Sequence, residues 1–140
     1  TPSSRATVEA RTGARRRILV IEDERAIGAF LAERLTMEGH DVVVDTDPME
    51  AVARFEAAPD NFDLVITDQT MPRLSGVGLV KALRQLRPEV PVVLCTGFSD
   101  AIDVGSARAL GVRRFLRKPV EPDTMLRVVS ELLEEQALVS

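Results

Sequence analysis

The chain of 140 residues has very few residues suited to disulfide bonds or soft metal sites. It contains one cysteine, Cys95, and one histidine, His40. A single cysteine cannot form an intrachain disulfide, and a cysteine-based zinc site would lack ligands. These absences favour a protein of the reducing cytoplasm, and they predict that any bound metal ion is held by oxygen atoms.

Aromatic side chains and long apolar runs are also scarce. The five aromatic residues are all phenylalanine, and the sequence has no tryptophan or tyrosine. The core must therefore be aliphatic, and the chain lacks the stacking platforms that bind single-stranded nucleic acid. The apolar runs are far too short to cross a bilayer, so we expect no membrane contact by this domain.

Positive charge is concentrated at the beginning of the chain. Residues 1–17 carry five arginines and one glutamate, whereas residues 18–140 have a net charge of −8. An acidic surface repels phosphate backbones, so we expect no direct nucleic acid binding by the domain.

The first 16 residues are rich in Ser, Thr, Ala and Arg. Such a segment cannot bury enough apolar surface to fold alone, and we interpret residues 1–16 as a flexible linker or tail, with a frayed terminus as the alternative. The chain begins with Thr1 and not with Met, which suggests a piece of a longer protein.

From Arg17 onward, short apolar runs alternate with stretches of helical periodicity. The predicted strands are Ile18–Ile21, Val42–Val44, Leu64–Thr67, Val92–Cys95 and Arg114–Leu116, and the predicted helices lie near 24–38, 48–57, 76–87, 100–110 and 122–136. Repeated βα units with strands of Val, Ile and Leu are typical of an α/β domain with a doubly wound parallel sheet. We place this domain at residues 17–136, followed by a tail at 137–140.

Polar side chains follow four of the predicted strands. Glu22 and Asp23 follow the first strand, Asp68 the third, Thr96 the fourth and Lys118 the fifth. In a doubly wound sheet, ligands bind at the carboxyl ends of the strands. Each residue alone is more often a helix cap or a surface residue, but together they bring carboxylates, a hydroxyl and an ammonium group to one edge.

This combination favours phosphate chemistry assisted by a metal ion. Converging carboxylates raise one another's pKa unless a cation lies among them, and oxygen ligands with open positions suit Mg²⁺. Lys118 can neutralise a phosphoryl oxygen, and Thr96 can donate a hydrogen bond to another.

Four segments resemble the receiver domain of two-component response regulators. They have the order and approximate spacing of that family: ILVIEDE, LVITDQTMPRLSG, VVLCTGF and FLRKP. The resemblance extends from Arg17 to about Leu133. It implies a flavodoxin-like sheet of five parallel strands in the order 2-1-3-4-5 with five helices, and a phosphoacceptor signalling domain, not an enzyme, that assists its own phosphorylation and slow dephosphorylation.

The resemblance also assigns roles to individual residues. Asp68 would accept phosphate from a histidine kinase or a histidine phosphotransfer domain, and Lys118 and Thr96 would contact the phosphoryl group. The implied Mg²⁺ ligands are Glu22, Asp23, Asp68 and the backbone carbonyl of Thr70. The first acid is Glu22, where Asp is commoner in the family, which lengthens a metal ligand or its water contact.

Further roles concern signalling. Thr96 and Phe115 would form the conformational switch, and because Phe115 stands in place of the commoner Tyr, packing alone sets its orientation. The implied partner-docking residues are Ile27, Phe30 and Pro119, and the Lys118–Pro119 peptide is expected to be cis.

The side chains two positions after Asp68 and Thr96 would control water access to the phosphoryl group. These are Thr70 and Phe98, and neither is suited to activate water. We therefore expect them to shield an aspartyl phosphate and to make it long-lived.

Two alternative functions fit the sequence less well. A Mg²⁺-dependent phosphatase of the haloacid dehalogenase type also uses an aspartate at a strand end, but it has a second aspartate where Thr70 stands, and its nucleophile follows the first strand. A nucleotide-binding module would need GxGxxG or GxxxxGK[ST], and the chain has neither motif. The sequences of the motifs favour the receiver of a hybrid sensor histidine kinase over a regulator truncated before its effector. We expect the domain to be cytoplasmic and its parent protein to be membrane-anchored.

Overall fold

The computed structural model describes residues 15–97 and 100–139. Its strands are β1 (Arg17–Ile21), β2 (Asp41–Asp45), β3 (Leu64–Asp68), β4 (Val92–Thr96) and β5 (Val112–Arg117). They pair in parallel in the order β2-β1-β3-β4-β5. The predicted α/β class and strand order are therefore confirmed.

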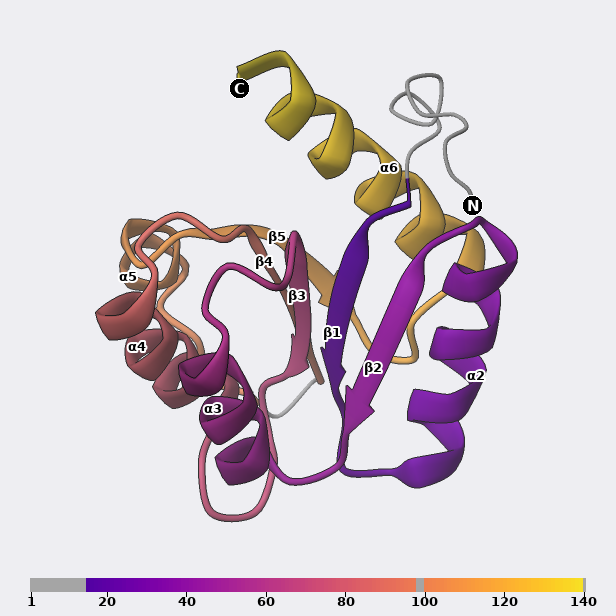
Figure 1. The fold of residues 1–140 in the computed structure, drawn as a ribbon. Coiled ribbons are helices and arrows are strands. Elements are labelled where there is room, and N and C mark those ends of the chain that lie inside the picture. The colour runs from indigo at the N-terminus through magenta and orange to yellow at the C-terminus, as the bar shows by residue number, and fades with distance from the viewer. Residues whose placement is uncertain (1–14, 98–99, 140) are drawn as a thin grey trace.

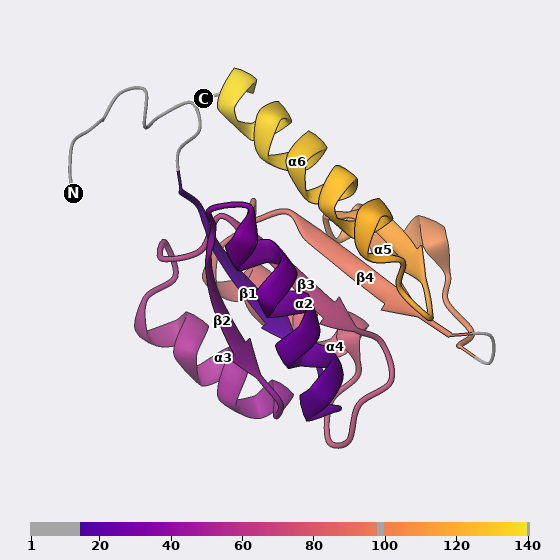
Figure 2. The same cartoon turned by 90° about the vertical axis from the view of Figure 1, so that its right-hand side faces the viewer.

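Helices cover both faces of this sheet. They are α2 (Arg25–Met37), α3 (Pro48–Ala57), α4 (Gly76–Leu86), α5 (Val104–Ala109) and α6 (Pro122–Val139). The helices α3, α4 and α5 lie on one face, and α2 and α6 lie on the other (Figure 1). Figure 2 looks onto the face that α2 and α6 cover. None of the helices described here is both long and apolar enough to span a membrane.

The central strands are apolar on both sides because each side meets a layer of helices. In β1, Leu19 and Ile21 belong to the core cluster under α3, α4 and α5, whereas Ile18 and Val20 belong to the cluster under α2 and α6. All four side chains are at most 1% exposed. Burial on both faces explains why the strand is a continuous apolar run and not an alternating one.

The ends of the helices follow local signals in the sequence. Asp47 caps α3 by accepting a hydrogen bond from the Met49 N–H, and Pro48 is the first helical residue. Gly39 and Gly111 follow α2 and α5 with φ of 96° and 98°, a conformation that favours glycine. The start of α3 and the ends of α2 and α5 therefore have a physical cause that the sequence shows.

Two predicted helix boundaries differ markedly from the structure. The fourth predicted helix, 100–110, begins only at Val104, because the Asp103 side chain accepts from the Ser106 N–H and so caps the helix at that point. The last helix continues to Val139, so most of the predicted tail at 137–140 is helical. Residues 1–14, which make up most of the predicted linker, lie outside the described residues.

Arg84 stabilises the edge of the sheet at which β4 and β5 begin. The Arg84 guanidinium, on α4, donates to the backbone carbonyls of Arg87, Val90, Leu110 and Gly111. These bonds join the end of α4 to the loops before β4 and β5.

Replacing Arg84 with Met should lower the free energy of unfolding by about 2 kcal/mol, because partly buried carbonyls lose their donors. The same change at Lys81, an exposed residue of the same helix, removes an equal charge and serves as the control. Urea denaturation measures both variants, and equal stabilities for the two would show that the arginine contacts contribute nothing.

Candidate functional site

The sheet register brings four polar side chains to one edge. Asp68 is the last residue of β3 and lies opposite Cys95 of β4, while Thr96 is the last residue of β4. Glu22 directly follows β1, and Lys118 directly follows β5. The sequence prediction that these strand ends meet is correct.

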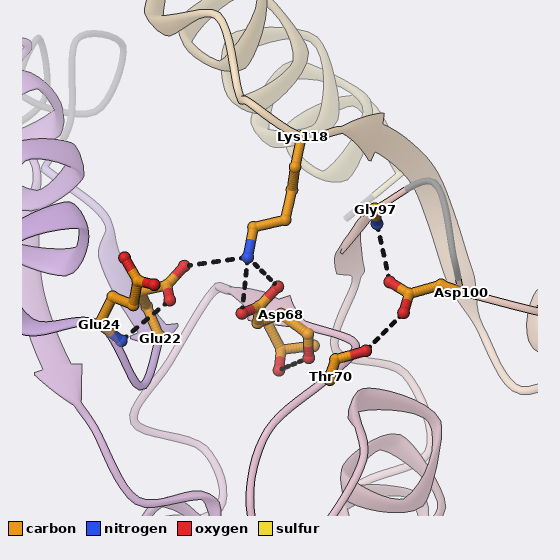
Figure 3. A network of polar contacts seen from close by, with 8 residues as sticks. Glu22, Glu24, Asp68, Thr70, Gly97, Asp100 and Lys118 are labelled. Atoms are coloured by element: carbon orange, nitrogen blue, oxygen red, sulfur yellow. Dashed lines mark hydrogen bonds and ion pairs between the residues drawn. The ribbon is translucent and has the colours of Figure 1, made fainter.

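The Lys118 ammonium group contacts two acids at this edge of the sheet. Its Nζ is 2.9 Å from each carboxylate oxygen of Asp68 and 4.0 Å from Oε1 of Glu22 (Figure 3). The backbone N–H of Lys118 also donates to the carbonyl of Thr96 at 2.8 Å, which joins the ends of β4 and β5. Asp68 and Glu22 are 3% and 4% exposed, so their charges are poorly screened by water.

Glu22, Asp23 and Asp68 form an acidic cluster. Each offers a carboxylate oxygen, and these oxygens lie within 4.8 Å of one another. Asp23 is exposed, so the cluster opens to solvent on one side. Glu22 is oriented by the backbone N–H of Glu24, which donates to its Oε2 at 3.0 Å.

Burial shifts the protonation of the two inner acids. It raises the pKa of Glu22 to about 7, with smaller contributions from Asp68 and Asp23, against the Glu24 N–H and Lys118. Burial also raises the pKa of Asp68, although the hydrogen bond and charge of Lys118 oppose it. Burial opposes ionisation of Lys118 too, but its contacts with Asp68 and Glu22 outweigh this and raise its pKa.

The cluster fits a divalent cation. Three carboxylates face a single ammonium group, and the buried Oδ1 of Asp68 has no hydrogen-bond donor although Lys118 lies near it. Oxygen ligands, excess negative charge and one open side match the preferences of Mg²⁺. Glu22, Asp23 and Asp68 are the residues that would hold such an ion.

The backbone around Asp68 allows close packing. A Cβ atom on Gly76, the first residue of α4, would lie 2.5 Å from the Asp68 carbonyl oxygen. Glycine has no Cβ, so α4 can begin at this position. The Gly76 N–H donates to the backbone carbonyl of Gln69, and the Val77 N–H donates to the Gln69 side chain. These hydrogen bonds join the start of the loop after Asp68 to the start of α4.

A second polar network lies beside the acids. The Thr70 hydroxyl donates to Oδ1 of Asp100, and the Gly97 N–H donates to its Oδ2 at 2.7 Å (Figure 3). These two bonds lower the pKa of Asp100. The sequence analysis missed Asp100, since it lay within a predicted helix and follows no strand directly.

The predicted switch residues share one hollow. Thr96 and Phe115 line a depression of about 470 Å³ together with Gly97, Asp100, Ile102, Val104, Leu116 and Arg117. Phe115 is half-buried, and the Arg108 guanidinium lies 5.4 Å from the centre of its ring. Phe98, the second residue expected to shield the phosphoryl group, lies outside the described residues.

The predicted docking residues differ in exposure. Phe30 on α2 is 45% exposed and Pro119 is exposed, whereas Ile27 is half-buried against the core under α2 and α6. The Lys118–Pro119 peptide is cis, as expected.

The raised pKa of Glu22 predicts how stability depends on pH without metal. In the unfolded chain Glu22 ionises near 4.5, whereas in the folded protein it ionises near 7. Between these values the folded state binds more protons, so the free energy of unfolding should fall as the pH rises through this interval.

Glu22→Gln should remove much of this dependence, whereas Glu33→Gln, at an exposed position of α2, should preserve it. Urea denaturation over the interval, in the presence of a chelator, measures the effect. A Glu22→Gln variant with the pH dependence of the wild type would contradict the assigned shift.

Comparisons with known proteins identify relatives over most of the chain. A family model described as "Response regulator receiver domain" matches residues 18–130. The chain is 33% identical over 119 residues to "Probable transcriptional regulator ycf27" of Cyanophora paradoxa, covering 85% of this chain and 48% of that protein. It is 31% identical over 117 residues to "Transcriptional regulatory protein CpxR" of Escherichia coli (strain K12), covering 84% of this chain and 49% of the relative. The chain thus spans about half the length of these two regulators.

Solved structures give the same result. A response regulator receiver domain protein from Clostridium thermocellum has a TM-score of 0.83 and 28% identity, covering 89% of this chain and 99% of its own. A CheY-like receiver domain protein from Methanospirillum hungatei JF-1 also has a TM-score of 0.83, at 27% identity, covering 91% of this chain and 100% of its own.

The haloacid dehalogenase alternative is not supported. Asp68 ends the third strand along the chain and not the first, and Thr70 stands where that family has its second aspartate. The family match, the sheet order and the acidic site agree with one another. The chain belongs to the response regulator receiver domain family of two-component systems.

Proposed function

We propose that Asp68 is the residue that accepts the phosphoryl group. The observation that carries this proposal is the position of Lys118 Nζ, 2.9 Å from both oxygens of a buried aspartate that also belongs to a three-acid cluster. Receiver domains take phosphate from histidine kinases or histidine phosphotransfer proteins, so the donor is a phosphohistidine.

In the transfer, an oxygen of the Asp68 carboxylate attacks the phosphorus atom. A P–O bond forms while the P–N bond to the donor histidine breaks, and the electron pair of that bond remains on the imidazole nitrogen. Phosphoryl transfer depends mainly on alignment and on charge stabilisation. The Lys118 ammonium is close enough to pair with a phosphoryl oxygen, and the Thr96 hydroxyl lies at the adjacent strand end to donate to another.

The receiver family binds Mg²⁺ at an acidic pocket, and we assign the ligands to Glu22, Asp23, Asp68 and the backbone carbonyl of Thr70. When bound, the ion neutralises negative charge on the carboxylates and on the phosphoryl oxygens. The longer side chain of Glu22 is held by the Glu24 N–H, which fixes one of its oxygens and leaves the other toward Lys118.

The signal would pass through Thr96 and Phe115. Both residues line the same hollow, so a movement of Thr96 toward the phosphoryl group changes the space beside the Phe115 ring. Because Phe115 has no hydroxyl, its contacts with the residues that line the hollow and with Arg108 determine its position. The short helix α5 and strand β5 would carry the change to a partner.

The phosphodonor protein would dock on α2 and on the loop after β5. Phe30 and Pro119 offer exposed apolar surface there, and Ile27 is partly accessible at the first turn of α2. We propose a cytoplasmic location and a parent protein in which this receiver, residues 17–136, follows a histidine kinase.

We expect that incubation with Mg²⁺ and a small acyl phosphate adds one phosphoryl group to the protein, and that Asp68→Asn abolishes the addition. The reason is that an amide lacks the nucleophilic carboxylate oxygen. Intact mass spectrometry under identical conditions measures both proteins.

Asp60→Asn is the matched control, since Asp60 is exposed in the loop between α3 and β3, at the opposite edge of the sheet. It should be labelled like the wild type. Undiminished labelling of Asp68→Asn would rule out Asp68 as the acceptor.

A further inference from the structure

Asp100 joins the loop that follows Asp68 to the backbone that directly follows the neighbouring strand β4. Its Oδ1 accepts from the hydroxyl of Thr70, in the loop between β3 and α4, and its Oδ2 accepts from the N–H of Gly97, directly after β4 (Figure 3). The Asp100 N–H also donates to the Gly97 carbonyl at 3.3 Å. One carboxylate therefore engages a donor from each segment.

The bridge lies within electrostatic reach of the phosphoacceptor site. The charge of Lys118 acts on Asp100, and the same ammonium contacts both oxygens of Asp68. Hydrogen bonds to an ionised carboxylate are stronger than those between neutral groups. In the unphosphorylated protein, an anion thus holds two donors, one from the loop that follows Asp68 and one directly after the neighbouring strand β4.

We propose that Asp100 is a positioning residue that competes with the phosphoryl group for these donors. The inference deepens the proposed role of Asp68 and rests on it. A phosphoryl group brings a charge of roughly −1.5 to −2 and three strong acceptor oxygens. Its charge repels the Asp100 carboxylate, and its oxygens are alternative acceptors for the Thr70 hydroxyl and the Gly97 N–H.

The bridge also restrains the switch residue. The Thr96 carbonyl accepts from the Lys118 N–H, and the next backbone N–H, that of Gly97, is bound to Asp100. Both polar groups of the peptide between Thr96 and Gly97, its C=O and its N–H, are therefore hydrogen-bonded. Release of Asp100 frees this peptide, and because Asp100, Ile102 and Val104 line the same hollow, it also alters the segment that leads into α5.

The competition predicts that loss of Asp100 strengthens the binding of a phosphoryl analogue. Beryllium trifluoride with Mg²⁺ coordinates a carboxylate oxygen and imitates an aspartyl phosphate, so it is the probe. In calorimetric titrations, Asp100→Ala should bind it about tenfold more tightly than the wild type, because one charge-assisted competitor is removed. Asp100→Asn, which keeps the shape and weaker hydrogen bonds, should bind about threefold more tightly.

Thermal unfolding of the same variants separates competition from a merely structural role. Both changes should lower the melting temperature, since the loops lose a bridge, whereas the affinity for the probe should rise. A structural role would lower the two together. Asp60→Asn, with the same change of charge in the loop before β3, should alter neither quantity, and Asp100→Asn keeps the test valid if Asp100→Ala does not fold.

The outcomes distinguish this inference from the proposal on which it rests. A wild-type protein that does not bind the probe would contradict the role of Asp68 and this inference with it. If the wild type binds the probe and the Asp100 variants bind it equally or more weakly, the inference alone is overturned.

Discussion

The contact between Lys118 and Asp68 is the interaction on which the site depends. A buried carboxylate at the end of a central strand is costly unless a cation neutralises it. Lys118 supplies that cation at 2.9 Å, and its own position follows from the pairing of the last residues of β4 and β5. The sheet thus determines the charge balance of the site through its register.

The remaining features of the edge accommodate this contact. Glu22 and Asp23 add negative charge that one lysine cannot balance, which leaves room for a divalent cation. Burial is the main cause of the raised pKa of Glu22, and the charges of Asp68 and Asp23 add to it. Gly76 permits α4 to begin directly against the Asp68 carbonyl, so that the acceptor is held by packed backbone and not by a loose loop.

Much of this site could be predicted from the sequence because its residues directly follow apolar runs. Strands such as β3 are recognisable without tertiary information, and parallel pairing then brings Glu22, Asp68 and Lys118 together. The sheet order and the residues at the strand ends needed only these local patterns and the family resemblance.

The details that could not be predicted depend on tertiary contacts. Asp100 and Asp103 are both acceptable helix caps by residue type, but Asp100 bonds to Thr70 and Gly97, so α5 begins after Asp103. The helix α6 extends beyond its predicted end at Gln136, because no glycine or proline follows that residue to mark where the helix stops. The exposure of Phe30 likewise depends on how α2 packs.

A crystal structure of the protein with Mg²⁺ and beryllium trifluoride tests most directly whether Asp68 is the phosphoacceptor. We expect beryllium bonded to an Asp68 oxygen, Lys118 Nζ moved onto a fluorine atom, and the metal ion bound among Glu22, Asp23 and Asp68. An analogue bound elsewhere, with Lys118 still on both oxygens of Asp68, would contradict that role.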